Sequence, residues 1–156
     1  MTPTQDWRAL VVGIGNHERG DDGVGAEVAQ IVDALQLAGV QVTHHREPLE
    51  LLAETLDTDI VIVVDAVSSG AAAGTVTVRD VHDDPLPDRA GTSGTHALGL
   101  GSVIELARAL GRLPRRMVIV GVEAAEFEPG NDLSTPVRAS MEKAASAVVA
   151  LIQERP

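Results

Sequence analysis

The sequence predicts an α/β fold: a single three-layer domain with a mostly parallel, twisted sheet of about five strands, covered by helices on both faces. Short apolar runs alternate with segments whose apolar residues recur at helical spacing, the pattern of parallel strands joined by crossover helices. The run Ile60–Val64 is apolar on both faces, as in the central strand of a covered sheet. Neither a repeat nor a linker interrupts the 156 residues, so we expect one domain over 1–156.

The elements of the first half follow from apolar runs and glycines. The run ALVV, which ends at Gly13, predicts a buried strand and a turn. Apolar residues then recur every three or four positions from Asp22 to Leu35, which indicates a helix that Gly39 closes. The remaining elements expected here are a strand at 40–45, a short helix at 47–56 around Leu49, Leu52 and Leu56, and the central strand at 60–64.

The second half continues the alternation. Residues 74–81 alternate polar and apolar, which favours a half-exposed edge strand, and the Asp-, Pro- and Gly-rich stretch 82–94 is expected to be loop. A helix capped by Thr95 and closed by Gly111 should follow. The last expected elements are a buried strand at 117–122 and a helix that starts at Thr135 and Pro136.

Composition excludes several function classes. No cysteine is present, so disulfides, thiolate catalysis and cysteine zinc sites are ruled out. A net charge of −11 and only 1% aromatic residues argue against nucleic-acid binding, which needs basic patches or stacking rings. We find no signal peptide and no apolar run of membrane-spanning length, and therefore expect a soluble, cytoplasmic protein that uses no membrane partner.

A glycine- and acid-rich segment, GIGNHERGDDGVG, follows the first strand. A Rossmann fingerprint would need a glycine at position 18, which is Glu. A P-loop would need a Gly-Lys-Ser/Thr sequence, and this segment contains no Lys, so both nucleotide-binding motifs are disfavoured. Ser93 lacks the spacing of a Gly-x-Ser-x-Gly elbow, which disfavours a serine hydrolase. Gly13, Gly15, Asn16, Gly23 and Gly25 are instead expected to shape a turn that Asn16 braces.

Three residues at strand ends or helix starts are the candidate site: Asp22, Asp65 and His96. Ligands in such folds gather beyond the carboxyl ends of the strands, where Asp65 follows the central run. Two carboxylates and one imidazole could neutralise a divalent cation while leaving coordination positions open. The neighbouring Asp21 is explained equally well by helix capping, and each of the three also has an ordinary structural explanation. Their convergence in space is an inference.

Four blocks in order resemble the hydrogenase maturation endopeptidases, the C-terminal processing proteases of hydrogenases. They are VVGIGNHERGDDGVG, VIVVDAV, GTSGTHALGL and GVEAAEFEPGNDLSTPV, and they extend from about Leu10 to Val137. The resemblance implies a metal-contacting trio of acid, acid and histidine, which falls on Asp22, Asp65 and His96. Some family members have Glu where this chain has Asp22, so metal affinity could differ. Residues 68–94 carry no landmark of the family.

The resemblance further implies endoproteolysis of a [NiFe]-hydrogenase large-subunit precursor, after nickel insertion, with the substrate's nickel as recognition element. No permanently bound metal is then required of the protease itself. The trio would contact that nickel, and a carboxylate or metal-bound hydroxide would activate water beside a polarised peptide carbonyl. Asp65 is the favoured base if a carboxylate acts directly. Two alternatives stay open: a non-catalytic checkpoint of the nickel site in hydrogenase assembly, and a Rossmann-like nucleotide-binding module.

Overall fold

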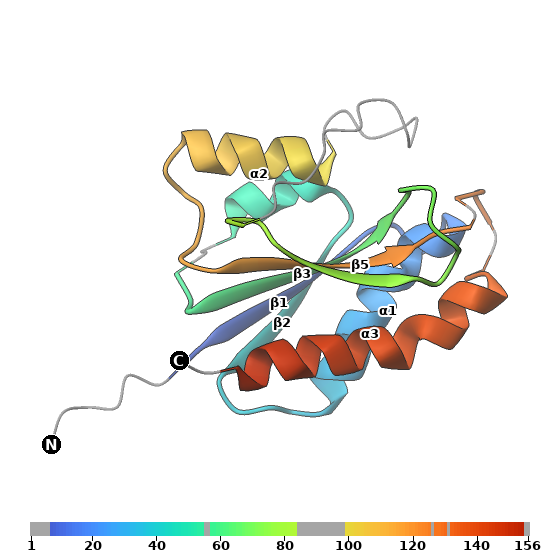
Figure 1. The fold of residues 1–156 in the computed structure, drawn as a ribbon, viewed down its shortest axis with the longest axis horizontal. Coiled ribbons are helices and arrows are strands. Elements are labelled where there is room, and N and C mark those ends of the chain that lie inside the picture. Colours follow the sequence, from blue (N-terminus) through green and yellow to red (C-terminus); the bar gives the residue numbers. More distant parts are fainter. Residues whose placement is uncertain (1–6, 55–56, 84–98, 126, 131, 155–156) are drawn as a thin grey trace, which may run out of the picture.

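The computed structural model describes residues 7–54, 57–83, 99–125, 127–130 and 132–154. They form one five-stranded sheet, with helices on both of its faces (Figure 1). The strands, in their order across the sheet, are β2 (Val40–His45), β1 (Ala9–Ile14), β3 (Ile60–Val67), β5 (Met117–Glu123) and β4 (Val76–Asp80). Only the edge strand β4 is antiparallel to its neighbour. The predicted fold class is confirmed, as are the central place of β3 and the edge place of β4.

The inner strands have apolar residues on both faces because both faces are covered. Alternate residues of each strand enter different layers of the core. Ile62 and Val120 pack in the layer that contains α1 and α3, whereas Val63 and Ile119 pack in the layer that contains α2. Each of these four side chains is at most 2% exposed, and burial of one contributes about 1.5–3 kcal/mol.

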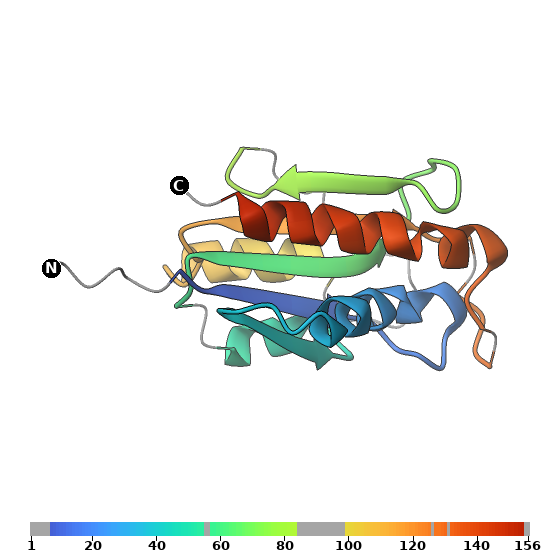
Figure 2. The same cartoon turned by 90° about the horizontal axis from the view of Figure 1, so that it is seen from below.

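Helices α1 (Val24–Ala34) and α3 (Thr135–Gln153) cover one face of the sheet, and Figure 2 shows them in front of the strands. Apolar residues on one side of each helix are buried against this face, among them Val28 and Val148. α3 begins with proline in its first turn, as the sequence predicts.

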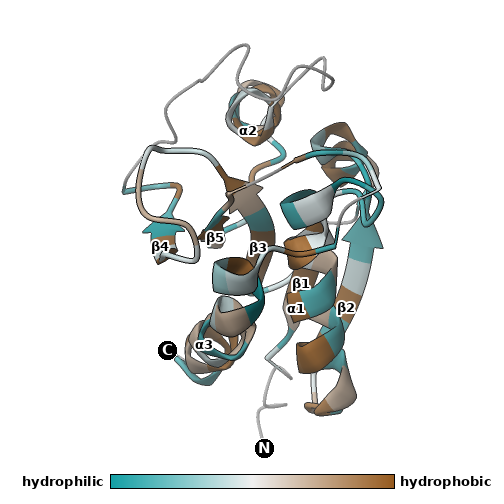
Figure 3. Cartoon of the chain, turned by 90° about the vertical axis from the view of Figure 1, so that its right-hand side faces the viewer, coloured by the Kyte–Doolittle hydropathy of each residue, from teal (hydrophilic) through white to brown (hydrophobic). Residues whose placement is uncertain are grey.

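The opposite face is covered by the 3₁₀ helix η2 (Pro48–Ala53) and by α2 (Leu100–Ala109). Figure 3 views the molecule from its right-hand side in Figure 1 and shows α2 across the sheet from α1 and α3. The expected short helix is thus present, but as 3₁₀ helix. With three residues per turn, Leu51 is the buried anchor, while Leu49 is 49% exposed, contrary to expectation.

Two helix boundaries differ from the prediction. A 3₁₀ turn, η1 (Gly20–Gly23), precedes α1, which ends at Ala34 rather than at Gly39. Gly39 instead adopts φ +75° directly before β2, where an added Cβ would lie 2.6 Å from the carbonyl oxygen of Trp7. α2 begins at Leu100 after an extended Gly99, and the expected cap, Thr95, lies outside the described residues. Gly111 does terminate α2, with φ +67°.

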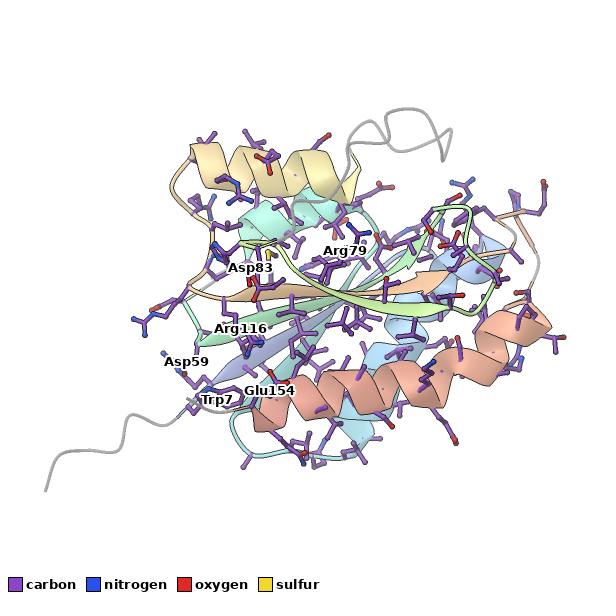
Figure 4. The ribbon with its side chains drawn as sticks, in the orientation of Figure 1. Trp7, Asp59, Arg79, Asp83, Arg116 and Glu154 are labelled. Atoms are coloured by element: carbon purple, nitrogen blue, oxygen red, sulfur yellow. The ribbon has the colours of Figure 1, made fainter. Side chains whose placement is uncertain are left out.

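The amino end of the sheet carries an ion-pair cluster between three elements, and Figure 4 labels two of its residues, Arg116 and Glu154. Arg116, just before β5, has its Nε 3.4 Å from Asp80 Oδ2 and its Nη2 3.0 Å from Glu154 Oε2. All three side chains keep contact with water, so the cluster contributes little to stability. No helix of the described ranges has the length and apolarity that crossing a bilayer would require.

Candidate active site

The site begins at the tight turn after β1. Gly15 has φ +137°, and an added Cβ there would lie 1.8 Å from the backbone oxygen of Asp22, so only glycine fits. Gly25 is equally constrained, because its Cβ would lie 2.4 Å from Val64 O and 2.5 Å from Ile14 O. These contacts let the start of α1 rest directly on the carboxyl ends of β1 and β3. Gly15 therefore shapes the turn as predicted, whereas Gly25 lies in α1 and is required for close packing of the helix on the strands.

Asp22 lies in η1, at the end of this turn, and is 8% exposed. The Asn16 N–H donates to Asp22 Oδ2 at 2.9 Å, and the Asn16 side chain accepts from the Glu18 N–H at 2.9 Å. Asn16 therefore braces the turn as predicted, and its backbone fixes the orientation of the Asp22 carboxylate.

Asp65 lies near the carboxyl end of β3, paired with Gly121 of β5, and keeps some contact with solvent. Burial by the surrounding protein raises the pKa of Asp65 well above its ordinary value, and the negative charge of Asp22 raises it further. A hydrogen bond with the backbone of Ala66 opposes the rise. The turn after β1 and the end of β3 thus bring the two predicted carboxylates within electrostatic reach of each other.

His96, the third predicted residue, lies outside the described residues, as does most of the segment before α2. α2 itself begins four residues later and lies on the sheet face to which Val61, Val63 and, by alternation, Asp65 belong. Among the residues that the structure describes, no three His, Asp or Glu side chains form a group able to hold a metal ion. The trio as a whole stays a prediction.

Asp21 has partners that the sequence does not reveal. It is fully buried, and its carboxylate accepts the Ala125 N–H at 2.8 Å, the Ser134 N–H at 2.7 Å and the Ser134 hydroxyl at 2.8 Å. The helix-capping interpretation does not describe these bonds, since η1 has Arg19 as its N-cap and no side-chain cap. Asp21 instead ties the glycine turn to the segment between β5 and α3.

Glu123 is a further buried carboxylate, which the sequence analysis did not single out. It is 3% exposed and terminates β5. Its carboxylate accepts hydrogen bonds from Ser69 and Gly70, in the loop that follows β3. The signal was available: an acid ends the apolar run of β5 just as Asp65 follows the apolar run of β3.

The histidines of β2 do not form a chelating pair, in agreement with the alternation of strand side chains. His44 Nε2 is 2.9 Å from the backbone oxygen of Gly15. His45 lies between two carboxylates, with Nδ1 3.0 Å from Glu50 and Nε2 2.6 Å from Glu54.

Comparison with known proteins yields one family. A family model described as hydrogenase maturation protease (HycI) matches residues 43–151. Hydrogenase expression/formation protein HupM of Azotobacter chroococcum mcd 1 is 34% identical over 152 residues, which cover 94% of this chain and 72% of the relative. Hydrogenase 2 maturation protease of Escherichia coli K12 is 29% identical over 152 residues, covering 94% and 92% of the two chains.

Solved structures agree. The hydrogenase maturating endopeptidase HybD from Escherichia coli superimposes with a TM-score of 0.78 at 28% identity, covering 94% of this chain and 93% of that chain. The hydrogenase maturation protease HycI from Thermococcus kodakarensis KOD1, at 22% identity, shares the fold with a TM-score of 0.74 and covers 97% and 96% of the two chains. The resemblance seen in the sequence is confirmed: this chain belongs to the hydrogenase maturation protease family and is a peptidase.

Proposed function

We propose that this peptidase removes the C-terminal extension of a nickel-loaded hydrogenase large-subunit precursor and recognises the precursor by its nickel. Family membership supports the reaction class. The observation that carries the nickel-recognition step is the pair Asp22 and Asp65, because the charge of the first raises the pKa of the second. Asp22 in η1 and Asp65 near the end of β3 repel each other, and a doubly charged ion between them would favour both charged forms.

The chemistry of the pair suits nickel that arrives with the substrate. Asp22 is held by the turn after β1 through the Asn16 N–H. A cation beside Asp65 would offset the charge of Asp22 and favour the charged form of the Asp65 carboxylate, which is the form that binds a metal ion. His96 is the proposed third group and would add a nitrogen ligand to the two oxygens. Nickel would thus hold the precursor with its scissile bond beside Asp65.

In the proposed reaction Asp65 is the general base. It takes a proton from the attacking water as the water oxygen bonds to the scissile carbonyl carbon, and it returns the proton to the leaving nitrogen. The substrate's cation would polarise the carbonyl oxygen. The place of Asp65 near the carboxyl end of β3, where ligands of such folds gather, supports this role.

The direct test is to incubate the protein with nickel-loaded and nickel-free precursor and to follow release of the C-terminal peptide by mass spectrometry. We expect cleavage of the nickel-loaded form alone. Equal cleavage of both forms would contradict nickel recognition, and stable binding without any release would favour the non-catalytic checkpoint.

Variants assign the residues. Asp65→Asn and His96→Ala should abolish peptide release while the circular dichroism spectrum stays that of the wild type. Asp59→Asn is the matched control: Asp59 also borders β3, but at its amino end, where it accepts the Arg8 N–H at 2.7 Å. Full activity of Asp65→Asn would rule out Asp65 as the base.

A further inference from the structure

The loop between β3 and β4, residues 68–75, is organised around a single residue, Glu123. Glu123 Oε1 accepts the N–H groups of Ser69 at 2.7 Å and Gly70 at 3.1 Å, and Oε2 accepts the Ser69 hydroxyl at 2.7 Å. The backbone of Glu123 holds the other end of the loop, because it accepts the Gly74 N–H at 2.8 Å and donates to Thr75 O at 2.9 Å. One residue therefore fixes both ends of the loop.

This arrangement is costly to build. A carboxylate that is 3% exposed loses most of its hydration, and none of the ion pairs found among the described residues supplies Glu123 with a cation. Its hydrogen-bond partners among the described residues, Ser69 and Gly70, are neutral donors of a surface loop. A neutral side chain would be enough to hold a loop whose only task is to connect two strands. The use of a buried carboxylate, which binds the loop more strongly, therefore indicates that the loop needs a defined shape.

The loop borders the candidate site. Asp65 and Val67 point to the same face of β3, and their partners on β5 are Gly121 and Glu123. Val67 packs closely over Gly121, since an added Cβ at Gly121 would lie 3.0 Å from Val67 Cγ1. The loop starts three residues after Asp65 and therefore begins beside that carboxylate.

The loop also has the surface that a peptide chain needs. Its sequence SSGAAAGT contains no side chain larger than threonine, and residues 68–72 are exposed. At Gly70, with φ +90°, an added Cβ would meet nothing within 4 Å. Small side chains leave the backbone accessible to a second chain, and a fixed loop binds with a smaller loss of conformational entropy than a mobile one.

We propose that Glu123 is a positioning residue that holds residues 68–75 as a docking surface for the peptide segment bearing the scissile bond. The proposal rests on the proposed function, and it names the part of the chain that receives the substrate's backbone. Glu123 touches neither substrate nor nickel in this scheme and acts through the loop.

The first test compares Glu123→Met with Glu123→Gln. Methionine has a similar volume but accepts none of the three bonds. The glutamine oxygen can accept hydrogen bonds from the two N–H groups, and its NH₂ group can donate to the Ser69 hydroxyl. The hydroxyl would then act as acceptor, whereas in the wild type it is the donor. We expect Glu123→Met to weaken binding of the nickel-loaded precursor roughly tenfold or more, and Glu123→Gln to weaken it far less. Hydrogen exchange at the Ser69 and Gly70 amides should accelerate in the methionine variant.

The second test leaves the interior untouched and holds even if Glu123→Met does not fold. Ala71→Trp places a large ring on the exposed loop, and Ala38→Trp places the same ring on an exposed connection at the opposite end of the sheet. Ala71→Trp should raise KM about tenfold with kcat nearly unchanged, and Ala38→Trp should alter neither. Unchanged affinity and KM in Ala71→Trp would overturn the proposal.

Binding and cleavage report on different claims. If wild-type protein binds the precursor without cutting it, the proposed reaction fails while the affinities of the loop variants still decide the docking surface. If wild-type protein neither binds nor cuts, both proposals are overturned.

Discussion

Asp21→Asn is expected to destabilise the protein by about 2–4 kcal/mol, although the two side chains have almost the same shape. The carboxylate accepts hydrogen bonds from the Ala125 N–H, the Ser134 N–H and the Ser134 hydroxyl. An amide has one oxygen. If that oxygen keeps the Ala125 bond, the NH₂ group faces the Ser134 N–H, and in the flipped orientation it faces the Ala125 N–H. One buried backbone donor is unsatisfied in either orientation.

The magnitude follows from this count. Loss of one bond to a charged acceptor costs about 1.5–3 kcal/mol, and the bonds that remain weaken because their acceptor becomes neutral. Asparagine is neutral, so the variant avoids the cost of burying a charge, and this offsets part of the lost hydrogen-bond energy. For a chain of this length, the net loss corresponds to a fall in Tm of about 5–15 °C. Ser134→Ala removes only the hydroxyl donor and leaves no backbone donor unpaired, so it should cost less than Asp21→Asn, about 1.5 kcal/mol.

Urea unfolding followed by circular dichroism measures these differences directly. Asp132→Asn is the matched control, since Asp132 is an exposed carboxylate in the same connecting segment and its replacement should change stability by less than about 0.5 kcal/mol. Amide exchange at Ala125 and Ser134 should accelerate in Asp21→Asn but not in the control. An Asp21→Asn protein as stable as the wild type would refute the idea that this carboxylate ties the glycine turn to the segment before α3.

Three further outcomes are expected. Asp65→Asn should stabilise the fold. The raised pKa of Asp65 gives the wild type a contribution to stability that is complete below the ordinary value of 3.8 and is lost as pH rises through the raised value. Urea unfolding at a series of pH values should therefore show the extra stability of the variant growing through that window and then levelling off, and extra stability that shrinks as pH rises would contradict the argument. Gly25→Ala should cost at least about 1–3 kcal/mol, because its Cβ would overlap the carbonyl oxygens of Val64 and Ile14, and an unchanged melting temperature would contradict this. Arg116→Ala should cost less than about 1 kcal/mol in the same assay, since its ion pairs are partly exposed, and a larger loss would show that the cluster is more than a surface feature.

Patterns that depend on neighbouring residues were predictable. The aliphatic runs give the strands, the alternation in β4 gives an edge, and Gly111 and Pro136 mark helix ends, because each of these signals is local to the chain. The choice of 3₁₀ helix at 48–53 was not predictable, since tertiary packing decides between helix types when only one or two turns form.

The site was predictable only in part, for a physical reason. Asp65 is recognisable as an acid that follows a buried apolar run. Its proximity to Asp22 follows from the parallel arrangement of β1 and β3. The roles of Asp21 and Glu123 depend on partners that lie 53 to 113 positions away in the chain. No periodicity records such pairings, so a buried acid could be flagged in the sequence but not assigned.

The strand order β2-β1-β3-β5-β4 has a consequence for synthesis of the chain. β5 fits between β3 and β4, yet it is made after both of them. Until residues 117–123 leave the ribosome, β3 has an open edge and β4 has no neighbour in the sheet, so the nascent chain exposes unpaired, apolar strand edges. Completion of the sheet therefore waits until residues 117–123 are made, and chains truncated before Met117 are expected to aggregate rather than to fold.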